Sequence, residues 1–166
     1  RDLESWIDQY HNGVLCGPFR FCDRSTVPSI DVMGQDVDLG EIPLTLGGEL
    51  AVRVQADTGD PRPPVTSGVA WVQREGFDDR TSGRFLNGAG EMILRGMAPG
   101  NYFIGLESRQ SSPLLVDEIF DDIDWPNRDF SRLPEGTAIQ IVGGGVSEAA
   151  FVLDPVTLLE ASGKVV

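Results

Sequence analysis

The sequence predicts an all-β protein, folded as an antiparallel sandwich. Three observations lead to this fold class. Apolar residues recur at every second position or in short runs, which is typical of strands. The 166 residues include 20 Gly and 11 Pro, so turns are frequent. About seven short strands are expected in a stretch of ~109 residues, a density typical of sandwiches.

The expected elements follow one another as strands separated by turns. The segments 29–33, 41–46 and 49–56 alternate between apolar and polar residues, whereas 68–74 and 148–153 contain short apolar runs. Glycine and proline punctuate the chain at 47–48, 57–64, 75–83, 87–90, 97–101 and 143–145. No helix longer than about one turn is expected, the best candidates being 7–11 and 117–123. Strands are expected at residues 3–7, 29–33, 41–46, 49–56, 68–74, 83–86, 91–94, 102–107, 114–119, 137–142, 148–153 and 158–166.

Part of the sequence occurs twice. Residues 14–44 align without gaps on residues 123–153 at a fixed offset of 109. A repeat of this length is a whole small domain, because solenoid units repeat every ~20–50 residues. We therefore expect a tandem array, in which 1–44 holds the closing strands of one repeat, 45–154 a complete repeat, and 155–166 the opening strand of a third. The identical aligned pairs are Phe21 with Phe130, Ile30 with Ile139, Gly34 with Gly143, Val37 with Val146, and Leu44 with Leu153.

The segment 88–108 carries a motif with glycines and an aromatic residue at fixed spacing, formed by Gly90, Gly96, Pro99, Gly100 and Tyr102. Gly96 and Gly100 are expected to bracket a tight turn that brings two strands together. Tyr102 is expected to enter the sandwich, with its hydroxyl reaching the backbone.

This motif resembles the signature of carboxypeptidase regulatory-like domains, which are transthyretin-like (Ig-like) β-sandwiches. The segment 48–64 is similar to the opening strand and following turn of that family, and 69–73 to its next strand. Such domains occur in tandem copies in large bacterial secreted proteins. The resemblance implies a sandwich fold and a place on or outside a bacterial surface, and it is only weakly specific for function.

The charge of the chain excludes some classes of partner. Its net charge is −13, from 26 acidic and 13 basic residues, so a nucleic-acid partner is disfavoured. No apolar stretch approaches the ~20 residues that span a bilayer, so membrane insertion is not expected. Lys164 is the sole lysine. The complete repeat therefore cannot form the internal Lys–Asn or Lys–Asp isopeptide bond of some surface sandwiches.

Cys16 and Cys22 are expected to form a disulfide. They flank a short loop that contains glycine and proline. In the second copy both are replaced together, by Trp125 and Ser131, as expected for a bonded pair. A disulfide indicates an oxidising compartment, consistent with an extracellular or cell-surface location. A metal site is disfavoured because His11 is the only histidine.

No constellation of residues predicts catalysis or a required cofactor. A Ser–His–Asp or Cys–His site would have to use His11, which lies in an expected turn. Calcium is the one ion worth considering, because it prefers several carboxylate oxygens. The alternative, a solvated acidic loop, is favoured because no known calcium-loop spacing is present. The acidic residues concerned are Asp117, Glu118, Asp121, Asp122 and Asp124, with Asp57 and Asp60 in one turn and Asp78 and Asp79 in another.

These observations favour a non-catalytic extracellular structural or adhesive module. Its expected partners are neighbouring repeats or further copies, joined head to tail. Incomplete sheets at both ends of the sequence could be completed by strand addition between neighbours, which would produce a filament. The alternative is an accessory carbohydrate- or protein-binding domain of a secreted enzyme. Trp125 is the best exposed aromatic for that role, whereas Trp71 is expected to be in the core.

Overall fold

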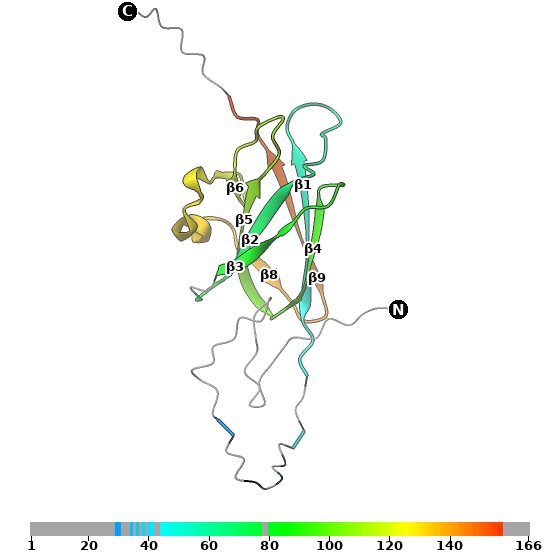
Figure 1. The fold of residues 1–166 in the computed structure, drawn as a ribbon, viewed down its shortest axis with the longest axis vertical. Coiled ribbons are helices and arrows are strands. Elements are labelled where there is room, and N and C mark those ends of the chain that lie inside the picture. Colours follow the sequence, from blue (N-terminus) through cyan, green and yellow to red (C-terminus); the bar gives the residue numbers. More distant parts are fainter. Residues whose placement is uncertain are drawn as a thin grey trace, which may run out of the picture.

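The computed structural model describes residues 44–77 and 80–157, together with positions 29, 30, 34, 36, 38, 40 and 41. In these described residues, nine strands lie in two sheets and two 3-10 helices lie at one side (Figure 1). The helices are η3 (Pro126–Arg128) and η4 (Phe130–Glu135). The strands are β1 (Gly48–Ala56), β2 (Gly68–Arg74), β3 (Arg80–Phe85), β4 (Glu91–Met97), β5 (Gly100–Ser108), β6 (Glu118–Ile119), β7 (Ile123–Asp124), β8 (Ile139–Ile141) and β9 (Val146–Leu153).

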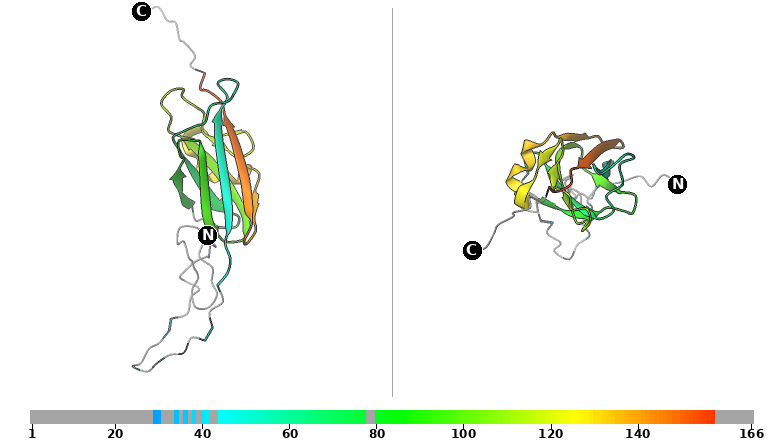
Figure 2. Two further views of the ribbon diagram at one scale, coloured as in Figure 1. Left: turned by 90° about the vertical axis from the view of Figure 1, so that its right-hand side faces the viewer. Right: turned by 90° about the horizontal axis from the view of Figure 1, so that it is seen from above.

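The smaller sheet has three strands in the order β4-β1-β9. They lie side by side in the left view of Figure 2. β4 pairs antiparallel with β1, with a register shift near Gly48. β9 pairs parallel with β1 over eight consecutive positions, from Glu49 opposite Val146 to Ala56 opposite Leu153, without a shift. The first and last strands of the sandwich are therefore direct neighbours.

The larger sheet has the order β3-β2-β5-β6-β7, and all its pairings are antiparallel. The long strand β5 pairs with β2 on one side and with two short strands on the other. Its first residues pair with β8, and Gly105 and Leu106 pair with β6. This division allows β8 and the β6–β7 hairpin to extend the same edge of the sheet.

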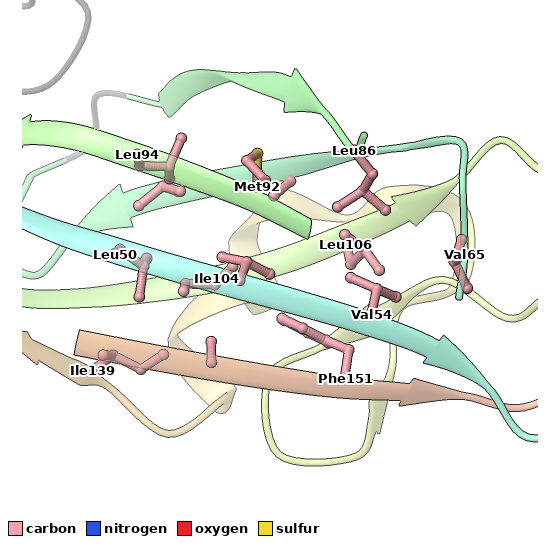
Figure 3. Packing of buried hydrophobic residues seen from close by; sticks show 14 of the residues in the cluster. Leu50, Val54, Val65, Leu86, Met92, Leu94, Ile104, Leu106, Ile139 and Phe151 are labelled. Atoms are coloured by element: carbon pink, nitrogen blue, oxygen red, sulfur yellow. The ribbon is translucent and has the colours of Figure 1, made fainter. Parts of the chain in front are cut away.

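The core lies between the two sheets and is filled by the apolar side chains at alternate positions of the strands. Along β1 the even-numbered residues Leu50, Val52 and Val54 are almost completely buried, whereas Arg53 is exposed. Burial of apolar area contributes about 25 cal/mol per Å² and is the main stabilising term. Figure 3 shows the packing of Leu50, Val54, Val65, Leu86, Met92, Leu94, Ile104, Leu106, Ile139 and Phe151.

The predicted fold class is confirmed, because the described chain is an all-β sandwich of two sheets. The strands expected at 49–56, 68–74 and 102–107 correspond to β1, β2 and β5. One pairing, that of β1 with β9, is parallel and not antiparallel as expected. The stretch 114–119 forms only the short strand β6, and 117–123 belongs to the β6–β7 hairpin and not to a helical turn.

Several predictions concern residues outside the described part of the chain. These are the strands at 3–7 and 158–166, the disulfide between Cys16 and Cys22, and most of the first repeat copy. The division into 1–44, 45–154 and 155–166 therefore stays a prediction, although the sandwich itself lies within 45–154.

Candidate functional site

The glycine motif does not form a hairpin. β4 and β5 belong to different sheets, so the turn at 97–100 carries the chain from one sheet to the other. The expected tight turn between two strands is present, but it joins β4 and β5 across the two sheets, and each strand pairs within its own sheet. Position 90 requires glycine for two reasons. Its φ of 72° is unfavourable for other residues, and a Cβ there would lie 2.5 Å from the carbonyl oxygen of Val54. Gly96 also has a positive φ, of 68°.

Tyr102 anchors this crossover from inside the sandwich. Its side chain is buried, and its hydroxyl donates a hydrogen bond to the backbone oxygen of Ala98 at 2.8 Å. Burial raises the pKa of Tyr102, against the opposing effect of the Arg74 charge. Arg74, which lies directly opposite Tyr102 on β2, holds the same turn by donating to the backbone oxygen of Pro99 at 2.7 Å. The guanidinium of Arg74 also lies against Gly100. The motif is thus a structural clamp between the sheets.

Trp125 is buried, with 1% of its surface exposed, so the expectation that it is an exposed sugar-binding aromatic is wrong. It packs against the outer face of the larger sheet, where its ring meets Phe130 edge-on at 5.1 Å. The absence of a side chain at Gly105 makes this possible, because a Cβ there would lie 2.5 Å from the indole. Its Nε1 donates to the backbone oxygen of Asp129 at 2.8 Å.

Trp125 belongs to a second, smaller core that the sequence did not predict. This outer core consists of Ile119, Trp125 and Leu133, with Trp71, Phe103, Ile123 and Phe130 packed around it. Trp71 was expected in a core on one face of its strand. It lies on the outer face of the larger sheet, half-buried against Phe130 with ring centroids 4.9 Å apart, and packs against this outer core. The helices η3 and η4 are therefore fixed to the sheet by aromatic packing. Gly105 within an apolar strand was the one signal of this close approach.

A buried carboxylate joins the outer core to the sheet. Glu107 is only 6% exposed. It accepts hydrogen bonds from Arg109 Nε at 2.9 Å and Trp71 Nε1 at 3.3 Å, and it forms an ion pair with Arg128 at 2.9 Å. Burial by itself raises the pKa of Glu107, but these partners outweigh it and hold the pKa below its ordinary value. A carboxylate with three such partners is suited to holding the outer core on the sheet and not to acting as a catalytic acid.

A second buried carboxylate, Glu118, lies among like charges. It is 8% exposed. Burial, followed by the charges of Asp122, Asp154 and Asp124, raises its pKa to about 7, although the backbone N–H of Asp122 opposes the shift. Asp122 has a φ of 58°, so the hairpin backbone is left-handed beside the carboxylate. This end of the larger sheet contains a carboxylate that is destabilising when ionised.

The calcium hypothesis finds no supporting geometry in the described residues. Among 44–77 and 80–157, no group of three or more acidic, cysteine or histidine side chains is placed to hold one ion. Asp57 forms an ion pair with Arg62 at 2.9 Å. Asp78 and Asp79 lie outside the described residues.

The predicted cysteine pair also lies outside these residues. Its aligned positions in the described copy, Trp125 and Ser131, flank η3 and the start of η4. In this copy the segment is held by Trp125 packed on Phe130 and by a hydrogen bond from Ser131 N to Asp129 Oδ1 at 3.0 Å. The expected disulfide in the first copy would close the corresponding segment covalently.

The parallel β1–β9 ladder lies between the two ends of the described chain. Residues leading into β1 lie at one end of the sandwich, and those leaving β9 lie at the other (Figure 1). The ladder is closed by a hydrogen bond from Glu49 N to Gly145 O at one end and from Asp57 N to Leu153 O at the other, both at 2.9 Å. The exit is fixed as well, because Val156 N donates to Leu114 O at 2.8 Å.

The other side of β9 is an open sheet edge. The closing bonds of the ladder show that odd-numbered residues of β9 direct their backbone groups toward β1. In a strand the alternate residues point the opposite way. Val146, Glu148, Ala150 and Val152 therefore direct N–H and C=O groups outward, and no strand of the described chain pairs with them. Glu148 is the single charged residue in this row, and the edge has no proline or bulge.

Comparisons with known proteins support the fold. The sandwich is similar to the crystal structure of GBS52, the minor pilin in the Gram-positive pathogen Streptococcus agalactiae, with a TM-score of 0.50 and 13% sequence identity. The match covers 72% of this chain and 49% of the pilin chain, so this chain spans about half of its length. No protein-family model and no curated protein matches the sequence. The resemblance to carboxypeptidase regulatory-like domains therefore stays a prediction beyond the level of the fold.

No helix in the described residues has the length and apolar character needed to cross a bilayer.

Proposed function

We propose that this chain is a non-catalytic structural module of an extracellular bacterial surface protein, repeated head to tail. The observation that carries the proposal is the parallel pairing of the first and last strands. Eight consecutive pairs join β1 to β9, and the chain enters and leaves at opposite ends of the sandwich. Copies joined through these ends form a row in which each module is traversed along its strands.

This arrangement resists tension. A force applied through the two ends of the sandwich acts along β1 and β9 in opposite directions. All the hydrogen bonds between the two strands are then loaded in shear at the same time, whereas a force that separates the strands from one end breaks the bonds one after another. Each bond contributes only about 1 kcal/mol in water, so resistance depends on simultaneous loading.

The remaining features agree with a surface structural role. The net charge of −13 favours solubility through mutual repulsion. The buried glutamate Glu107 has three structural partners. The described sandwich contains no lysine, so its tensile strength would rest on backbone hydrogen bonds and packing, not on an internal isopeptide bond. The similarity of the fold to that of a minor pilin also supports a structural role at a surface.

We further propose that neighbouring repeats or copies associate by adding a strand to an incomplete sheet. An extended segment that pairs with an open edge gains main-chain hydrogen bonds without requiring a preformed pocket. Repetition of such a head-to-tail contact generates an open filament.

Electron microscopy of the native parent protein tests the module proposal. The nine residues of β1 span roughly 30 Å, so negative-stain images should show elongated rows with an axial repeat of roughly 40 Å once turns are included. Compact particles without an axial repeat would contradict the proposal.

A further inference from the structure

The open edge of β9 has a defined chemistry. Four residues present unpaired backbone groups, and their side chains lie on the outer face of the smaller sheet. Val146 is 64% exposed, which is unusual for a valine within a strand. On the inner face Ala149, Phe151 and Leu153 are buried. A segment that completes this edge must therefore be extended, apolar on one side and polar on the other.

Residues 158–166 of the same sequence have this pattern. Leu159, Ala161, Gly163 and Val165 are apolar or small at alternate positions, and Glu160, Ser162 and Lys164 are polar between them. This period of two is typical of a strand with one buried face. The segment also contains the only lysine of the chain.

Building on the proposed strand addition, we propose that residues 160–166 of one copy pair antiparallel with the open edge of β9 in a second copy. Lys164 then lies opposite Glu148, the one charged residue of the edge. In this register residues 160–166 cover 146–152, and the even-numbered residues of both strands exchange the hydrogen bonds. The pairing ends at Val152, because the backbone oxygen of Asp154 already accepts a hydrogen bond from Val116 N. A parallel arrangement with the same charge pair would cover only 146–150.

The side chains of the two strands match in this register. On the inner face Gly163 lies opposite Ala149, and Ala161 lies opposite Phe151, so small residues adjoin the bulky ring. On the outer face the exposed Val146 gains Val166 as its neighbour. The added strand thus extends both the core and the ladder.

The backbone after β9 favours pairing between copies over pairing within one chain. Pairing of 160–166 with its own β9 would require the chain to reverse within 153–159. Part of that stretch is held by the opposite loop instead: Leu115 forms an antiparallel bridge with Pro155, and Val116 N donates to Asp154 O at 2.9 Å. These contacts hold residues 154–156 extended and paired along the open-edge side, so the chain does not turn back onto its own β9 there.

Charge reversal in the full chain tests the proposed register. Analytical ultracentrifugation should show concentration-dependent association of the unmodified chain. Lys164→Glu or Glu148→Lys should each weaken it roughly threefold to tenfold, because a cross-strand attraction becomes a repulsion. The double variant should restore it. A chain that stays monomeric, or association that ignores both charges, would overturn the proposal.

A cysteine-mixing experiment distinguishes pairing between copies from pairing within one. One variant carries Ala150→Cys and another Ser162→Cys, both with Cys16→Ser and Cys22→Ser. Hydrogen-bonded antiparallel neighbours lie about 5.5 Å apart at Cα, within disulfide range. Oxidation of the mixture should give crosslinked dimers that neither variant gives alone. Absence of this dimer would overturn strand addition to β9, while the electron-microscopy test of the tandem module would be unaffected.

Discussion

Replacement of Glu118 by glutamine should stabilise the protein at alkaline pH. The folded protein holds this carboxyl at a pKa of about 7, and the ordinary value is 4.5. Above pH 7 the group is ionised in both states, and the folded state bears the cost of burying the charge near three aspartates. A difference of about 2.5 pKa units corresponds to about 3 kcal/mol, and a folded pKa one unit lower would still leave about 2 kcal/mol.

The pH dependence follows from the sign of the shift. Because the folded pKa is raised, stability from this group is fully present below pH 4.5 and is lost as the pH rises through 7. Glu118→Gln retains an oxygen that can accept the backbone hydrogen bond from Asp122. The variant should therefore exceed the unmodified protein in unfolding free energy by about 3 kcal/mol at pH 8 and by almost nothing at pH 4.

Urea unfolding at the two pH values measures this difference directly, and thermal unfolding should show a rise of roughly 10 °C at pH 8. Glu148→Gln on the exposed outer face serves as the matched control, with a change expected within about 0.5 kcal/mol. Equal stability of Glu118→Gln and the unmodified protein at pH 8, or a gain that does not depend on pH, would refute the reasoning.

Three further substitutions test the clamps of the sandwich. Tyr102→Phe should lower the unfolding free energy by about 1–3 kcal/mol, measured in urea, since a buried backbone oxygen loses its donor. Gly105→Ala should cost more than 2 kcal/mol and alter the fluorescence of Trp125, because the new methyl group overlaps the indole. Gly59→Ala, which meets no neighbour within 4 Å, is its control, and equal losses at both sites would contradict the packing. Glu107→Gln should lower the unfolding free energy at neutral pH, and the difference from the unmodified protein should shrink as the pH falls through the depressed pKa of the folded carboxyl. A difference that stays the same at low pH would contradict the stabilising role of the ionised Glu107.

Most of the strands could be predicted from local periodicity, because the alternation of apolar and polar residues within a segment is enough to indicate a strand. In β1 apolar and buried residues alternate with polar and exposed ones, and the expected strand at 49–56 differs from the observed Gly48–Ala56 by one residue. The parallel pairing with β9 could not be predicted, because it joins segments almost 100 residues apart and depends on how both sheets close.

The outer core was missed for a similar reason. Trp125 stands in an acidic stretch next to proline, and local composition predicts exposure there. Its burial depends on space left by Gly105, on a strand distant in sequence. The turn after Gly96 was expected to bring two strands together, but the sequence did not distinguish a hairpin from a crossover between sheets, because the same glycines suit both.

The central claim is that the β1–β9 ladder resists tension along the sandwich. Single-molecule force spectroscopy can load this ladder in two directions, in a chain carrying Cys16→Ser and Cys22→Ser. Handles at Leu44→Cys and Val156→Cys, which lie at opposite ends, load it in shear. Handles at Leu44→Cys and Val146→Cys, which lie at the same end, separate the strands one bond at a time. All three attachment points are exposed.

The account predicts that the sandwich unfolds at a severalfold higher force in the first geometry than in the second. Equal unfolding forces in the two geometries would contradict it, because the parallel ladder would then not be the element that resists tension.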